Sequence, residues 1–130
     1  MIPAPDDPCP CGGGTYGTCC GPALDGSRPA PTAEALMRSR YTAFAVGDVA
    51  YLLRSWHRST RPPTLELDDD LVWRRLVVLG VEAGGPWDDE GVVEFVAQYA
   101  SGLVRGRLHE RSRFVRDDGW QYVDGIAPVE

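Results

Sequence analysis

The sequence predicts an α+β fold, in which helices come first, strands follow, and a short cysteine-rich segment precedes both. The length of 130 residues suits one ordinary domain with a small appendage. Apolar residues recur at helical spacing between residues 33 and 45, and the period changes to two from Trp73 onward. Helices followed by a run of strands are expected to pack as one layer on an antiparallel sheet.

Composition and charge narrow the classes of function. Hydrophobic residues make up 43% of the chain and charged residues 25%, as in soluble globular domains. No apolar run approaches the ~18 residues of a membrane-spanning helix and no signal peptide is visible, so we expect a cytoplasmic protein without a membrane span. The net charge of −6 argues against nucleic acid as a partner, because nonspecific binding to phosphates requires a basic face.

The strongest chemical signal is the cluster Cys9, Cys11, Cys19 and Cys20, which contains every cysteine of the chain. Four thiolates can bind Zn²⁺ tetrahedrally. Disulfide pairing, typical of small secreted domains, and free or redox-active thiols are the other interpretations, although no C-x-x-C pair is present. We favour zinc, because the glycines at positions 12–14 let the chain fold back and so short a segment needs a metal to hold it together. Four sulfur ligands leave no position open for a substrate, so this Zn²⁺ would be structural.

Two helices are predicted after a polar linker at residues 25–31. Thr32 is a typical N-cap, and the helix that it begins buries one apolar face and ends at Gly47. Asp48 can cap a second, shorter helix through residues 49–53. Pro62 and Pro63 prevent any continuation of this helix beyond them.

Four strands are predicted in the second half of the chain, namely Leu76–Ala83, Val92–Ala100, Leu103–Arg116 and Trp120–Ile126. Two of the connections are short enough for hairpin turns, so the sheet should be an antiparallel meander. In the third strand one face should be solvated, because it carries Arg105, Arg107, His109, Arg111 and Arg113. Glu110 and Ser112 would then point inward, where a carboxylate needs a partner. Glu110 is therefore either a pocket group or a structural residue that bonds a helix end or an arginine such as Arg38 or Arg40.

The cysteine segment resembles the SEC-C motif, a small zinc-binding element found at the tail of the SecA translocation ATPase and in other bacterial proteins. The matching residues are Cys9-Pro-Cys11-Gly, Tyr16 and Cys19-Cys20-Gly21, with one residue fewer than usual between the two halves. The resemblance implies that Cys9, Cys11, Cys19 and Cys20 are the zinc ligands. It also implies a separate zinc-binding motif at residues 1–24, which we call the knob.

Motifs along nearly the whole chain resemble the YchJ family of bacterial proteins. They include the segments at residues 34–44, 51–52, 56–57, 91–95, 109–114 and 118–125. This resemblance implies a domain at residues 32–130 with the fold of nuclear transport factor 2, shared with ketosteroid isomerase and SnoaL-type cyclases. In that fold three helices pack into a strongly curved antiparallel sheet, and a pocket lies at the open end of the resulting cone.

Two classes of function are consistent with these features. In the first, which we prefer, the chain is a binding or adaptor protein whose zinc knob presents a rigid surface to a protein partner. In the second, it is an enzyme of isomerase, cyclase or hydrolase type that performs acid–base chemistry on a small apolar ligand in the conical pocket. The candidate pocket residues are Tyr41, Trp56, His57, Glu94, Glu110 and Ser112.

Overall fold

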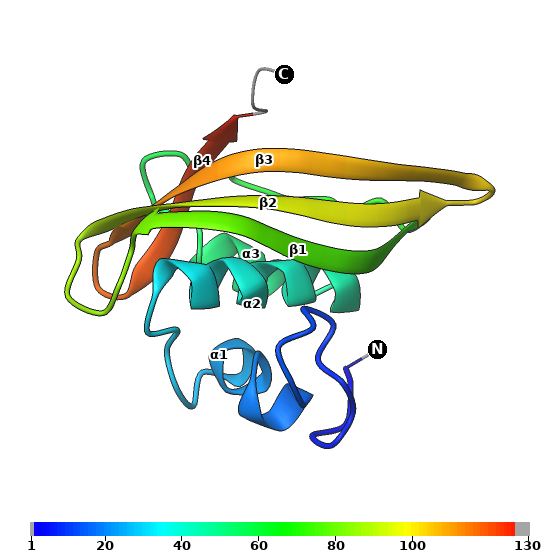
Figure 1. The fold of residues 1–130 in the computed structure, drawn as a ribbon, viewed down its shortest axis with the longest axis horizontal. Helices are drawn as coiled ribbons and strands as arrows, with labels where there is room; N and C mark the ends of the chain where they lie inside the picture. Colours follow the sequence, from blue (N-terminus) through cyan, green and yellow to red (C-terminus); the bar gives the residue numbers. More distant parts are fainter. Residues whose placement is uncertain (1, 127–130) are drawn as a thin grey trace.

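The computed structural model describes residues 2–126 and has the predicted α+β architecture. The four strands form one antiparallel sheet in the order β1-β2-β3-β4. Figure 1 shows three layers: the curved sheet, then α2 and α3 beneath it, then the N-terminal segment on the other side of α2. The elements are the 3₁₀ turn η1 (Tyr16–Thr18), the helices α1 (Gly21–Asp25), α2 (Ala33–Val46) and α3 (Val49–Arg54), and the strands β1 (Leu71–Ala83), β2 (Glu90–Ser101), β3 (Val104–Arg116) and β4 (Trp120–Ile126).

The two predicted helices are confirmed with their caps. The Thr32 side chain accepts a hydrogen bond of 3.1 Å from the Ala35 amide at the start of α2. Gly47 ends α2 in the left-handed conformation, with a φ of 80°. Asp48 accepts a hydrogen bond of 2.9 Å from the Tyr51 amide and so begins α3. The family resemblance implied three helices in this domain. The described residues from 32 onward contain two, α2 and α3.

Strand β1 begins at Leu71, five residues before the predicted start at Leu76. A register shift between Trp73 and Arg75 places an extra residue in β1 opposite β2. This bulge interrupts the alternation of apolar and polar residues, which explains why the sequence pattern did not reveal the first part of the strand. Strand β4 has the predicted bounds, and β2 and β3 differ from theirs by two residues or fewer at either end.

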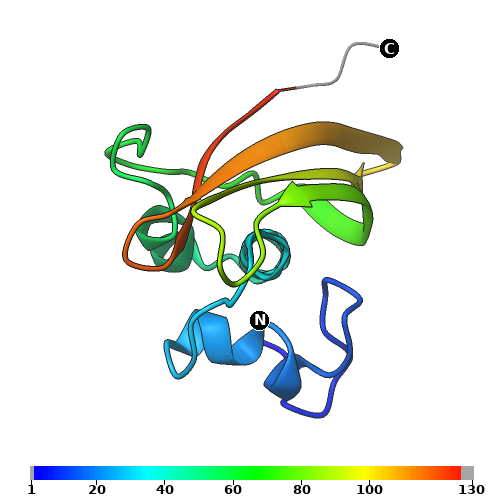
Figure 2. The same cartoon turned by 60° about the vertical axis from the view of Figure 1, so that its left-hand side comes forward.

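The N-terminal segment contains helical structure that the sequence analysis did not predict. The turn η1 lies between the two cysteine pairs, and α1 follows Cys20, with Pro22 near its start. Tyr16 and Leu24 are buried in the same hydrophobic cluster as Leu36 and Met37 of α2. Arg54 of α3 also donates a hydrogen bond of 2.7 Å to the Leu24 carbonyl. The knob is therefore packed on the helices of the domain (Figure 2).

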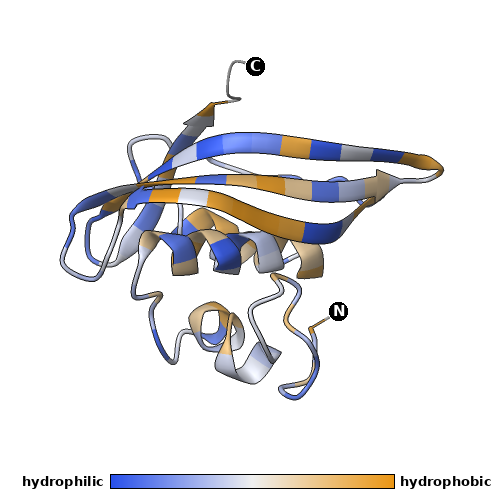
Figure 3. Cartoon of the chain, viewed as in Figure 1, coloured by the Kyte–Doolittle hydropathy of each residue, from blue (hydrophilic) through white to orange (hydrophobic). Residues whose placement is uncertain are grey.

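The two faces of the sheet differ in polarity, as the strand pattern predicted. On β2, the inner face carries the buried side chains of Val93, Phe95 and Ala97. Strand β3 is hydrophilic over most of its length in Figure 3, and its outer face carries Arg105, Arg107, Arg111 and Arg113. Phe114 and Ser112 point inward and are almost fully buried. Leu108 lies at the same inward-facing spacing on β3, but it is 39% exposed.

Candidate metal centre and apolar cavity

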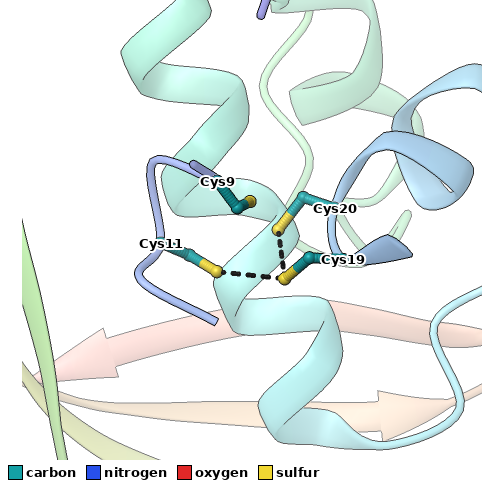
Figure 4. A group of neighbouring side chains, drawn as sticks. All are labelled: Cys9, Cys11, Cys19 and Cys20. Atoms are coloured by element: carbon teal, nitrogen blue, oxygen red, sulfur yellow. Dashed lines mark hydrogen bonds between the residues drawn. The ribbon is translucent and has the colours of Figure 1, made fainter. Parts of the chain in front are cut away.

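The sulfur atoms of Cys9, Cys11, Cys19 and Cys20 all lie within 4.8 Å of one another. Cys11 Sγ is 3.4 Å from Cys19 Sγ, which in turn is 3.9 Å from Cys20 Sγ (Figure 4). A tetrahedral Zn²⁺ with Zn–S bonds of ~2.3 Å requires sulfurs ~3.8 Å apart. All four thiols are free, so the disulfide interpretation is wrong. The cluster has the dimensions to hold one metal ion.

Tight backbone turns bring the two halves of the cluster together. The Cys9 amide donates a hydrogen bond of 2.7 Å to the Gly14 carbonyl, and the Gly12 amide donates one of 2.9 Å to the Cys9 carbonyl. Gly12 and Gly14 have φ angles of 84° and 127°, which residues with a side chain rarely adopt. At Gly13 a Cβ atom would lie 2.9 Å from the sulfur of Cys19. The three successive glycines thus allow the loop to close around the sulfurs.

Helix α2 supplies polar groups around the cluster. Thr42 Oγ1 lies 3.7 Å from Cys9 Sγ and is fully buried. Arg38 donates a hydrogen bond of 3.0 Å to the Cys11 carbonyl and pairs with Glu34 at 2.9 Å. Outer groups of this kind orient metal ligands and strengthen the site. The cysteine cluster is therefore connected to the main domain through one face of α2.

The thiols influence one another's protonation. Interactions with Cys11 and Cys20 hold the pKa of the Cys9 thiol well below its usual value. Interactions with Cys11 and Cys9, together with burial, raise the pKa of Cys20. Burial, followed by the interaction with Cys11, raises the pKa of Cys19 to about 12. Without a cation, the cluster stabilises one thiolate at the expense of the others, whereas a divalent cation stabilises all four.

A second feature, an apolar cavity of about 280 Å³, lies between α2 and the inner face of the sheet. Most of its wall is aromatic or aliphatic, and its polar side chains come from α2, β3 and β4. Of the six predicted pocket residues, four line it: Tyr41, Trp56, Glu110 and Ser112. The other lining residues are Met37, Arg40, Phe44, Trp73, Phe95, Ala97, Leu108, Phe114 and Tyr122.

Glu110 is a cavity residue and not the ion-pair partner of Arg38 or Arg40. Its Oε1 accepts a hydrogen bond of 2.8 Å from Ser112 Oγ. Its side chain also lies against Gly125 of β4, where a Cβ atom would overlap the carboxylate. Among the described residues no ion pair of Glu110 is found, so the pocket interpretation of this residue has the support of the geometry.

The other two predicted pocket residues, His57 and Glu94, do not line the cavity. His57 follows α3, and its ring contacts Asp117 at 2.9 Å and Ser59 at 2.7 Å. Glu94 points to the outer face of the sheet, because it lies one residue from the inward Phe95 on β2. There it pairs with His109 at 2.8 Å and with Arg111 at 3.0 Å.

Arg40 is the cavity residue that the sequence analysis missed as a site residue. It is 5% exposed, although it carries a charge. Its guanidinium carbon lies 5.0 Å from the ring centre of Trp56 and 4.6 Å from that of Tyr122, so two aromatic rings flank it. The signal in the sequence was its position: it follows Met37 by three residues and so lies on the buried face of α2.

Comparison with known proteins places this architecture in a family. The sequence model of the YchJ middle domain, described as NTF2-like, matches residues 32–125. The chain belongs to the YchJ family. A UPF0225 protein of Chromobacterium violaceum is 54% identical over 124 residues, covering 92% of each chain. A UPF0225 protein of Streptomyces coelicolor is 51% identical over 123 residues, covering 93% of this chain and 96% of the relative.

Two solved structures extend the YchJ comparison to the knob. The solution structure of a SEC-C motif containing protein from Rhodopseudomonas palustris superposes with a TM-score of 0.82 at 35% identity, covering 93% of this chain and 98% of the other. A crystal structure of a SEC-C motif containing protein from Psychrobacter arcticus gives a TM-score of 0.70 at 25% identity, covering 89% and 74%. The resemblance to SEC-C proteins is thereby confirmed. No helix among the described residues is both long and apolar enough to cross a membrane.

Proposed function

We propose that this YchJ-family protein is a binding protein whose knob is held on α2 by a structural zinc ion. The observation that carries the proposal is the set of four sulfur atoms within 4.8 Å of one another. Four thiolate ligands complete a tetrahedral zinc site and leave no position for a reacting molecule, so the ion would stabilise structure. Free thiols in such a cluster suit a reducing compartment, which favours the cytoplasm.

The side chains of the cavity favour binding over acid–base catalysis. Burial raises the pKa of Tyr41 to about 12, and burial together with the Glu110 carboxylate raises the pKa of Tyr122 to about 12. Both phenols keep their protons near neutral pH and are weak acids there. His57, the one predicted base with an imidazole, lies outside the cavity. An isomerase, cyclase or hydrolase would depend on Glu110 alone for proton transfer, so this alternative has less support.

The exposed side of the knob is the surface that we propose for a protein partner. Residues 12–15 and 17–18 are exposed, while Cys9, Cys11 and Cys20 beneath them are buried. A metal bound to these cysteines would fix the exposed loops in one conformation and so reduce the entropy lost on binding. The net charge of −6 continues to argue against nucleic acid as this partner.

Two measurements test the proposal. Native mass spectrometry of the untagged protein should show one zinc ion, and Cys9→Ser/Cys11→Ser should lose it. Affinity capture should then yield a partner with the wild type that is lost with this double variant and with Thr18→Arg, which changes the exposed surface of the knob and keeps zinc. Leu103→Arg, at the exposed β2–β3 turn, is the matched control and should retain the partner. Identical partners for all variants would contradict the adaptor role, and a wild type without zinc would contradict the metal site.

A further inference from the structure

The cavity contains a buried cation, Arg40, that has no carboxylate partner among the described residues. Arg40 Nη1 donates hydrogen bonds to the Leu52 carbonyl at 2.8 Å and to Ser55 Oγ at 2.7 Å. These are its hydrogen bonds within residues 2–126, and no ion pair to a carboxylate is found there. Glu110, the acidic side chain among the lining residues of the cavity, affects Arg40 only through space. The positive charge at this end of the cavity is therefore stabilised by two neutral oxygens and two aromatic rings.

A buried guanidinium of this kind is costly unless something compensates its charge. Burial lowers the pKa of Arg40 to about 10, so the group remains charged at neutral pH. The guanidinium has five N–H donors in a fixed plane, and the bonds of Nη1 leave the donors on Nε and Nη2 for another acceptor. Because Arg40 lines the cavity, a bound anion can reach these donors. Carboxylates match the guanidinium geometry best, since both groups are planar and can form two parallel hydrogen bonds.

The other walls of the cavity determine which apolar part of a ligand can bind next to its anionic group. Tyr41 and Trp73 lie edge to face with ring centres 6.0 Å apart, and Phe44 and Trp73 are 6.2 Å apart. With Phe95 they form a largely aromatic surface across the cavity. The volume of about 280 Å³ lies just below the ~300–1,000 Å³ typical of ligand pockets, so it suits a molecule with one or two rings.

We propose that the cavity binds a small aromatic carboxylic acid, whose carboxylate pairs with Arg40 and whose ring packs among Tyr41, Phe44 and Trp73. Glu110 is the acidic group that faces the same space, and it opposes the binding of an anion. Removing its charge should therefore strengthen binding, whereas removing the charge of Arg40 should weaken it. This proposal is independent of the zinc site, because no cysteine lines the cavity.

The experiment titrates the full-length, zinc-loaded protein with three acids: phenylacetate, 4-phenylbutyrate and indole-3-acetate. Two analogues share the ring of phenylacetate but lack its negative charge: phenylacetamide is uncharged and phenethylamine is a cation. Amide and side-chain NMR shifts report the site, and their dependence on ligand concentration gives the affinity. We expect at least one acid to bind at the cavity, about tenfold or more tightly than phenylacetamide. The proposal is overturned if no acid shifts the cavity resonances, if phenylacetamide binds equally well, or if phenethylamine binds more tightly.

Variants then test the roles of the two charged groups. Glu110→Gln should bind the acid several-fold more tightly, and Arg40→Gln should bind it tenfold or more weakly while its affinity for phenylacetamide changes little. Equal losses for the acid and the amide in Arg40→Gln would overturn the pairing. If Arg40→Gln does not fold, Leu108→Trp at the partly exposed rim of the cavity should abolish binding, and Leu103→Trp at the distant turn should not. Unchanged binding in Leu108→Trp would also overturn the proposal. Zinc content is measured for each variant, so a failure of the metal site is recognised separately.

Discussion

The hydroxyl oxygen of Thr42 lies 3.7 Å from the sulfur of Cys9, and both residues are buried. Thr42 belongs to α2, whose opposite side faces the sheet, so a single helix connects the cysteine cluster with the main domain. A hydroxyl next to a thiolate ligand can donate a hydrogen bond that stabilises the negative charge. This contact adds a direct link from the domain to a cysteine side chain, beside the hydrogen bonds of Arg38 and Arg54 to the knob backbone.

This contact predicts a loss of zinc affinity in Thr42→Val. The valine keeps the shape of the side chain but cannot donate to Cys9 Sγ, so the affinity for zinc should fall about tenfold. Competition with a chromophoric zinc chelator measures it. Thr32→Ala, at the N-cap of the same helix, is the matched control: it should lower the free energy of unfolding by about 1 kcal/mol and leave zinc affinity unchanged. Equal zinc affinities in wild type and Thr42→Val would show that the hydroxyl does not act on the metal site.

Removal of the metal should destabilise the whole chain and not the knob alone. Tyr16 and Leu24 share one buried cluster with Leu36 and Met37 of α2, so a loosened knob exposes part of the core. A loss of about 2 kcal/mol corresponds to a fall in Tm of roughly 8 °C for a chain of this size. Thermal unfolding with and without a strong chelator measures the effect. The Cys9→Ser/Cys11→Ser variant should show no further fall on chelation, and a wild-type Tm insensitive to the chelator would contradict the coupling.

The β1–β2 connection predicts a large cost for one glycine substitution. A Cβ atom at Gly91 would lie 2.5 Å from the Gly84 Cα and 3.1 Å from the Cβ of Ala33. The first of these is backbone, which cannot move aside without breaking the 2.9 Å hydrogen bond from the Ala33 amide to the Gly84 carbonyl. Gly91→Ala should therefore lower the free energy of unfolding by about 2–3 kcal/mol. Urea denaturation measures it.

Gly80→Ala in β1 is the control for this substitution. Gly80 is exposed, and no atom lies within 4 Å of the position of its Cβ. The free energy of unfolding should change by less than about 0.5 kcal/mol. Similar values for the two variants would mean that the close approach at Gly91 does not constrain the hairpin.

The sequence predicted those parts of the structure that depend on local chemistry. Thr32 and Gly47 marked the ends of α2 because a capping hydroxyl and a left-handed glycine act on their own neighbours. The strand alternation likewise placed Ser112 on the inner face. The bulge at Arg74 has no local signature, so the start of β1 was missed.

Long-range contacts account for the errors in the predicted site. The sequence did not reveal that Trp56 and Tyr122, which pair through a parallel bridge, enclose Arg40. Glu94 was a pocket candidate because of its carboxylate, yet it alternates with buried apolar residues on β2 and lies on the outer face. The alternation along the strand predicted the position of Glu94 better than its residue type did. Successive side chains of a strand point to opposite faces whatever their chemistry.

The Glu94 cluster predicts how stability depends on pH. Glu94 of β2 is hydrogen-bonded to His109 and Arg111 of β3, and Arg111 also pairs with Glu82 of β1 at 3.1 Å. His109 first, and then Arg111, hold the pKa of the Glu94 carboxyl below its usual value of 4.5. A carboxyl with a lowered pKa in the folded state stabilises the fold above its ordinary pKa, and this contribution is lost as the pH falls through the folded value. Glu94→Gln should therefore have a lower Tm than the wild type at pH 7, and the difference should shrink below about pH 4.

Thermal unfolding of both proteins between about pH 3 and pH 7 measures the difference in Tm. The ionic strength is held constant, since salt screens exposed pairs. Glu66→Gln controls for the loss of one negative charge, because Glu66 is exposed and forms no ion pair among residues 2–126. Its Tm should follow that of the wild type at every pH. A Tm difference between the wild type and Glu94→Gln that stays constant down to pH 3, or that grows there, would show that the charge of Glu94 is not what stabilises this face of the sheet, since a protonated carboxyl and an amide carry the same charge.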